Sequence, residues 1–103
     1  MKKVIKGGKV TTSTDVFEAD LLIEDGVITQ IAKTIDVADA EVIDASGKYV
    51  MPGGIDPHTH LDMPFNNTVT DDDWESGTIA AAFGGTTTIL DFCLSAGETK
   101  LSD

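Results

Sequence analysis

The chain has 103 residues, of which 41% are hydrophobic and 24% charged, a composition typical of one folded globular domain. Eighteen acidic side chains against seven basic ones give a net charge of −11, which argues against nucleic acid or an anionic membrane surface as a partner. The sequence contains no apolar run near the length of about 18 residues that a transmembrane helix needs, and no signal peptide, so we expect a cytoplasmic protein. The single cysteine, Cys93, excludes an intramolecular disulfide.

Residues 1–52 are predicted to form short strands joined by tight turns. Gly7 and Gly8 are expected to make the first turn, because glycine accepts the positive φ that two-residue turns need. The clearest hairpin pairs 20–24 with 27–31, since Asp25 and Gly26 between β-rich runs favour a type I′ turn. Another turn is expected at 45–47. Strands at this close spacing predict part of a small β-sandwich.

The pattern changes from residue 53 onward. We predict a strand over 54–61, a polar loop over 62–70, and then a helix that Thr70 or Asp71 caps and that Gly84 and Gly85 end. A second, β-branched strand follows over 86–92. This parallel β-α-β unit is how a (β/α)8 barrel begins, and such a barrel takes about 250 residues. We therefore predict an α/β fold with a β-rich N-terminus, in which 1–52 is part of a β-sandwich and 53–103 is a truncated barrel.

His58 and His60 are the only histidines of the chain. Side chains at positions i and i+2 of a strand share a face, so both imidazoles should be directed toward one point, as a metal site requires. Asp56 falls on the same alternation, and we expect it to orient a ligand, to cap a turn or to bind the metal directly. Two solvent-facing strand histidines are the alternative interpretation, because this spacing alone is a weak signal.

The sequence around the histidines, Tyr-Val-Met-Pro-Gly-Gly-Ile-Asp-Pro-His-Thr-His-Leu-Asp-Met-Pro-Phe over 49–65, resembles the first barrel strand of the amidohydrolase superfamily. Within it, the segment is most similar to that of the dihydropyrimidinases and D-hydantoinases, and residues 77–88 also resemble the hydantoinase pattern. The resemblance implies a β-sandwich beside a (β/α)8 barrel. It also implies a hydrolase that opens the ring amide of dihydropyrimidines or 5-substituted hydantoins with a hydroxide held between two divalent metals.

The resemblance also implies roles for particular residues. His58 and His60 match metal ligands, and Met63 and Phe65 match apolar contacts in a lid over the substrate. The alternative for Met63 and Phe65 is that they are loop residues that pack on the rim of the barrel. In the family the other ligands, a carboxylated lysine, two histidines and an aspartate, come from later barrel strands, and this chain has no histidine after position 60. We therefore expect an N-terminal fragment that contains no complete catalytic set and is inactive alone, with zinc as the expected metal and manganese as the alternative.

Two further interpretations stay open. The chain could be a noncatalytic module derived from this family, in which exposed strand edges pair with a partner or with other copies of the chain. In either case we expect a homo-oligomer, because parallel strands are normally covered on both faces. Alternatively, its lineage could be that of the allantoinases or dihydroorotases, which also use a His-x-His strand. Only the residues at 61–65 favour the hydantoinase type over these.

Overall fold

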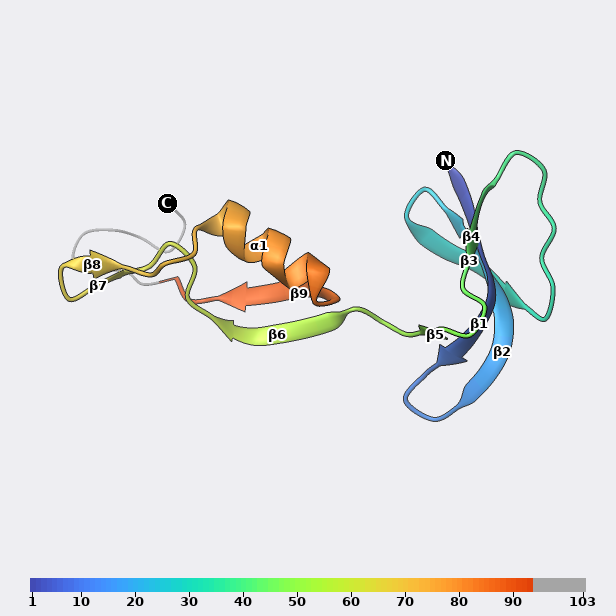
Figure 1. Cartoon of the computed structure of the whole chain (residues 1–103), viewed down its shortest axis with the longest axis horizontal. Coiled ribbons are helices and arrows are strands. Elements are labelled where there is room, and N and C mark those ends of the chain that lie inside the picture. The colour runs from blue at the N-terminus through green and yellow to red at the C-terminus, as the bar shows by residue number, and fades with distance from the viewer. Residues whose placement is uncertain (94–103) are drawn as a thin grey trace. The chain divides into compact units, whose positions relative to one another are not determined.

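A computed structural model describes residues 1–93 of the chain. The chain divides into two compact units, one formed by Met1–Pro52 and the other beginning at Gly53, and both can be followed in Figure 1. The last residues of the predicted domain 53–103, from 94 onward, lie outside the described residues.

The first unit is a single five-stranded sheet. Its strands are β1 (Lys2–Thr11), β2 (Val16–Glu24), β3 (Val27–Ala32), β4 (Glu41–Asp44) and β5 (Tyr49–Val50). The order is β3-β2-β1-β4, and β5 also pairs with β1. The β1–β2 and β2–β3 pairs are antiparallel, whereas β4 and β5 run parallel to β1.

The hairpin between β2 and β3 confirms its prediction. Asp25 has φ of 48° and Gly26 has φ of 83°, so both central residues take the positive φ of a type I′ turn. The segment between β4 and β5 also turns, with Gly47 at a φ of 74° and the amide of Lys48 donating to the carbonyl of Ala45 at 2.9 Å. This second turn does not make a hairpin, because both flanking strands pair in the same direction with β1.

The predicted turn at Gly7 and Gly8 is wrong, because both residues lie inside β1. The register of β1 against β2 shifts between Ile5 and Gly8, which marks a bulge. Gly7 has φ of 70°, and its amide donates to the carboxylate of Asp20 at 2.9 Å. A Cβ on Gly8 would lie 2.5 Å from a methyl group of Val50. The glycine pair therefore serves a bulge and a close contact within the sheet.

The buried side chains of the described residues all lie in this first unit. Six of the apolar ones form two clusters, one of Val4, Leu22 and Ile35 and one of Val10, Ala19 and Leu21. These clusters lie beside Asp20, a carboxylate that is only 5% exposed and that accepts hydrogen bonds from the amides of Gly7 and Ile35, each at 2.9 Å. These two amides hold the pKa of Asp20 below its usual value of 3.8.

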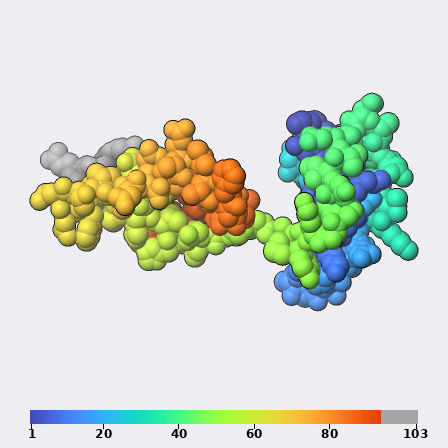
Figure 2. All heavy atoms as spheres, viewed as in Figure 1, coloured from blue at the N-terminus to red at the C-terminus, as the bar shows by residue number. Residues whose placement is uncertain are grey.

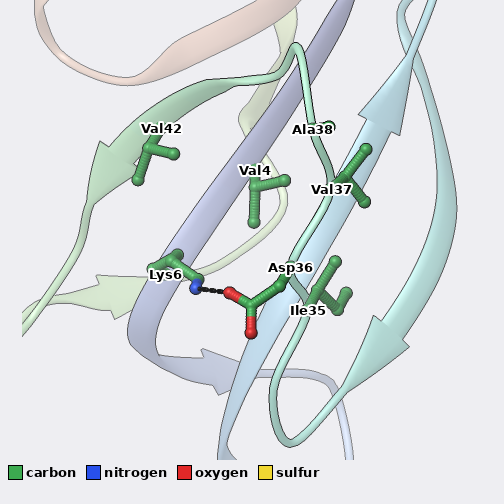
Figure 3. Close-up of a pocket in the computed structure, with 7 residues that line it drawn as sticks. All are labelled: Val4, Lys6, Ile35, Asp36, Val37, Ala38 and Val42. Carbon is green, nitrogen blue, oxygen red and sulfur yellow. Dashed lines mark hydrogen bonds and ion pairs between the residues drawn. The ribbon is translucent and has the colours of Figure 1, made fainter.

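A shallow pocket of about 270 Å³ lies next to the first cluster. Figure 3 shows its wall, in which the ammonium group of Lys6 donates to the carboxylate of Asp36 beside apolar side chains such as Val4 and Ile35. The contact with Asp36 raises the pKa of Lys6. Because Asp36 is largely exposed, this ion pair contributes little to stability.

The second unit contains a strand, a small hairpin, a helix and a strand. These are β6 (Gly54–Thr59), β7 (Pro64–Phe65), β8 (Thr68–Val69), α1 (Trp74–Phe83) and β9 (Thr86–Asp91). Strands β6 and β9 pair in parallel, as predicted, and both point toward the β7–β8 hairpin (Figure 1). The predicted polar loop over 62–70 therefore holds a short hairpin, whose turn residues Asn66 and Asn67 have φ of 47° and 64°.

Helix α1 begins later than predicted, because its N-cap is Asp73 rather than Thr70 or Asp71. The carboxylate of Asp73 accepts the amide of Ser76 at 2.8 Å, and the hydroxyl of Ser76 accepts the amide of Asp73 at 3.1 Å. This capping box also holds the pKa of Asp73 below its usual value. The predicted end of the helix is confirmed, with Gly84 as the C-cap and Gly85 at a φ of 84°.

None of residues 53–93 is buried. Ile55 of β6 is 65% exposed and Leu90 of β9 is 54% exposed, although parallel strands are normally covered on both faces. In Figure 2 the helix and the β7–β8 segment both lie at the surface of this unit. Across the described part of the chain, no helix has the length and apolar content to cross a membrane, and the cytoplasmic location stays a prediction.

Candidate metal centre

The end of β6 carries an irregularity that shapes the site. Asp56 pairs with Ile89 and Thr59 pairs with Asp91, so three steps along β6 match two steps along β9. Pro57 lies inside this bulge, and it has no amide hydrogen to give to the neighbouring strand. The amide of His58 instead donates to the carboxylate of Asp56 at 3.1 Å. A side chain of the same strand thus accepts the amide that follows Pro57 in the bulge.

The two histidines are brought together, as their spacing predicts. Their Nε2 atoms lie 3.1 Å apart, and their ring centroids lie 5.0 Å apart at an interplanar angle of 77°. The hydroxyl of Thr59, which lies between them in the sequence, donates to the carbonyl of Leu90 at 3.2 Å. Both imidazoles are exposed to solvent, so an ion can reach them.

The distance between the two Nε2 atoms fits one metal ion. Two nitrogen ligands at about 2.0–2.1 Å from a tetrahedral zinc ion lie about 3.3–3.4 Å apart, close to the observed 3.1 Å. The same separation suits an N–H···N hydrogen bond between the two rings when no metal is bound. Within residues 1–93, no group of three or more His, Cys, Asp and Glu side chains is arranged to hold a metal. The described residues therefore offer two ligands.

Phe92 is a component of the site that no sequence motif indicated. Its ring centroid lies 4.7 Å from that of His58 and 4.9 Å from that of His60. Phe92 directly follows β9, whose C-terminal end lies beside that of β6. The predicted parallel pairing of the two strands was the signal that could have found it, because paired parallel strands end at the same edge and residue 92 stands at the end of the second strand.

Asp56, expected to orient a ligand, to cap a turn or to bind the metal, accepts its hydrogen bond from the backbone of His58. The expected alternation placed Asp56 on the face of the imidazoles. The bulge between Asp56 and Thr59 interrupts that alternation. The observed contact corresponds to the turn-capping alternative.

The two predicted lid residues lie in different surroundings. Met63 lines an open pocket of about 400 Å³ together with Trp74 and Phe92. Phe65 lies in β7 and is 60% exposed, and it is not among the residues that line this pocket. The structure therefore brings Met63, and not Phe65, to the pocket that Phe92 also lines.

The loop that carries these residues is closed at its base. The amide of Asp62 donates to the carbonyl of Asp72 at 2.8 Å, and the amide of Thr70 donates to the carbonyl of Met63 at 3.0 Å. The hydroxyl of Thr70 accepts the amide of Met63 at 2.9 Å. Met63 is thus held on both its backbone groups, while the tip of the hairpin extends beyond these contacts.

Comparisons with known proteins agree with this geometry. A family model described as "Amidohydrolase family" matches residues 41–97, more than half of the chain. The chain therefore belongs to the amidohydrolase family.

Its relatives include D-hydantoinase of Geobacillus stearothermophilus, which is 70% identical over 94 residues, or 91% of this chain and 20% of that protein. Dihydropyrimidinase 1 of Caenorhabditis elegans is 50% identical over 91 residues, or 87% of this chain and 19% of that protein. These matches confirm the resemblance to hydantoinases and dihydropyrimidinases that residues 49–65 and 77–88 indicated. The chain spans about a fifth of the length of these relatives.

Solved structures give the same result. A crystal structure of D-hydantoinase matches 96% of this chain, at 64% identity and a TM-score of 0.92, over 22% of its own length. A crystal structure of dihydropyrimidinase from Brevibacillus agri matches 99% of this chain, at 55% identity and a TM-score of 0.93, again over 22% of its length. The β-rich fold with one helix is therefore the fold of the matching part of these enzymes.

Proposed function

We propose that this chain supplies the first metal-binding strand of a metal-dependent cyclic amidohydrolase of the D-hydantoinase and dihydropyrimidinase type. The observation that supports it most is the 3.1 Å separation of the Nε2 atoms of His58 and His60, in a chain of the amidohydrolase family. Zinc is the proposed ion and manganese the alternative, in a binuclear site of the whole enzyme. In this proposal β6, α1 and β9 begin a (β/α)8 barrel, and the five-stranded sheet is part of a β-sandwich.

The residues of the chain have separate tasks in this proposal. His58 and His60 hold the metal as neutral imidazoles, and Asp56 fixes the backbone that carries the first of them. The divalent metal that the two imidazoles would hold would supply Lewis-acid polarisation of the ring amide of a dihydropyrimidine or a 5-substituted hydantoin. Met63 contacts the apolar part of this small substrate from the pocket beside Phe92, and Phe65 reaches it from the exposed hairpin.

Zinc titration of the purified chain tests the metal-binding part. The control is a double variant, His58→Ala with His60→Ala, which keeps every carboxylate of this acidic chain and so reports nonspecific binding. We expect the double variant to lower the association constant for zinc by at least about tenfold, since loss of supporting groups alone costs about 10- to 100-fold. Equal titration curves for the two proteins would contradict the proposal.

An activity assay tests the expectation that the chain is inactive alone. Two imidazoles are fewer than the three protein ligands that catalytic zinc sites generally have. With dihydrouracil or hydantoin and added zinc or manganese, we expect no turnover above that of the double variant. Metal-dependent hydrolysis that disappears in the double variant would refute this expectation.

A second candidate function is a noncatalytic module that associates with its own copies. The supporting observation is that none of residues 53–93 is buried, with Ile55 and Leu90 more than half exposed on adjacent parallel strands. At about 25 cal/mol per Å² of apolar surface, covering such side chains favours association. Sedimentation velocity separates the two candidates, because a stable monomer at micromolar concentration rules out the module.

A further inference from the structure

The C-terminal end of β9 holds the end of β6 through one carboxylate. Asp91, the last residue of β9, accepts the amide of Leu61 with its Oδ2 atom at 2.8 Å. Its Oδ1 atom accepts the amide of Phe92 at 2.6 Å. The two oxygens therefore bind the backbone of two segments that lie far apart in the sequence.

Both amides belong to parts of the backbone that orient the imidazole site. The amide of Leu61 is in the peptide that follows His60, and His60 lies beyond the last residue of β6, where the ladder of strand hydrogen bonds has ended. Fixing that peptide restricts the backbone of His60 and so the direction of its ring. The amide of Phe92 restricts the residue whose ring contacts both imidazoles.

Asp91 acts through the backbone and is not itself one of the paired ring ligands. The residues that the structure describes contain no third metal-ligating side chain grouped with His58 and His60. The bond to Leu61 also spans 30 residues of sequence, so it joins the two strands and does not merely close a local turn. The sequence gives no local reason for this contact.

We propose that Asp91 is the positioning residue of the histidine pair, which holds His60 and Phe92 in the arrangement that lets His58 and His60 share one metal ion. This inference rests on the proposed function, because it assigns Asp91 a task in the same metal centre. The chemistry required is that of a carboxylate with two acceptor oxygens. Asparagine keeps one of these oxygens and alanine keeps neither.

The test combines zinc titration with NMR of the metal-free chain, on Asp91→Ala, Asp91→Asn and the wild type. Asp44→Asn is the matched control, because the carboxylate of Asp44 also accepts a backbone amide, that of Ser46 at 2.9 Å, in the other unit. We expect Asp91→Ala to lower the association constant for zinc by about 10- to 100-fold, Asp91→Asn to give an intermediate loss, and Asp44→Asn to match the wild type.

The NMR measurement follows the nuclear Overhauser contacts from the ring of Phe92 to both imidazoles. In the wild type we expect both contacts, and in Asp91→Ala we expect the contact with His60 to weaken while the amide signals of α1 are unchanged. If Asp91→Ala disturbs α1, Asp91→Asn is compared in its place. Wild-type zinc affinity in a folded Asp91 variant, or ring contacts that this variant retains in full, would overturn the proposal for Asp91.

The two measurements separate this inference from the proposed function. Wild-type zinc binding no stronger than that of the His58→Ala, His60→Ala double variant would refute the metal centre. In that case the ring contacts alone still decide whether Asp91 positions His60 and Phe92. Specific zinc binding in the wild type that Asp91→Ala retains in full would refute the role of Asp91 and leave the metal centre supported.

Discussion

Replacing Asp20 with asparagine should destabilise the first unit more than any surface substitution. Asp20 is 5% exposed, and its carboxylate accepts the amides of Gly7 and Ile35, each at 2.9 Å. Asparagine has one acceptor oxygen, so one amide loses its partner and faces an NH₂ group. A hydrogen bond to a charged group contributes about 1.5–3 kcal/mol, and an unsatisfied buried amide costs about 1–3 kcal/mol.

We therefore expect Asp20→Asn to lower the free energy of unfolding by about 2–4 kcal/mol, a large part of the 5–15 kcal/mol that is typical of whole domains. Urea denaturation followed by circular dichroism at neutral pH measures it, with an unchanged m-value as the sign that the same structure unfolds. Asp44→Asn, at an exposed carboxylate that also accepts an amide, is the control. A loss below about 0.5 kcal/mol, the range of ordinary surface changes, would refute the reasoning.

The stability of the first unit in acid, the close contact at Gly8 within β1 and the turn of the β7–β8 hairpin can each be tested. The folded pKa of Asp20 lies below its usual 3.8. The contribution of this carboxylate to the free energy of unfolding is therefore complete above that pH and is lost as the pH falls through the folded pKa. In acid denaturation curves, the stability difference between wild type and Asp20→Asn should shrink below about pH 4. Gly8→Ala, whose Cβ would lie 2.5 Å from Val50, should cost about 1–3 kcal/mol in urea denaturation. Asn67→Gly should strengthen the β7–β8 hairpin, seen as larger strand-like Hα shifts, since its φ is 64°.

Features set by neighbouring residues could be predicted from the sequence. Asp25 with Gly26 and the glycines after α1 define their turns locally, and those predictions are confirmed. The cap at Asp73 was also visible in principle, since Ser76 stands three residues later as a capping box requires. The prediction placed the cap earlier because Thr70 and Asp71 are also good capping residues.

Features set by distant residues could not be predicted in the same way. Gly7 lies in a bulge because Asp20, on another strand, supplies an acceptor for its amide. The proximity of His58 and His60 followed from their spacing, but Phe92 reaches them only through the pairing of β6 with β9. Local sequence patterns predict turns and the spacing of residues on one strand. Which residues contact each other across neighbouring strands depends on the register of the sheet.

The bulge at Pro57 has a consequence for protein engineering. A designer who transplants only the two histidines into a regular strand of another scaffold copies their spacing but not the local backbone that presents them. The graft should include Asp56 and Pro57, which lie at the bulge, and a neighbouring strand that ends in an aspartate and is followed by a phenylalanine. The portable unit is therefore a pair of strand ends, and a scaffold for it needs two adjacent parallel strands that end at the same edge.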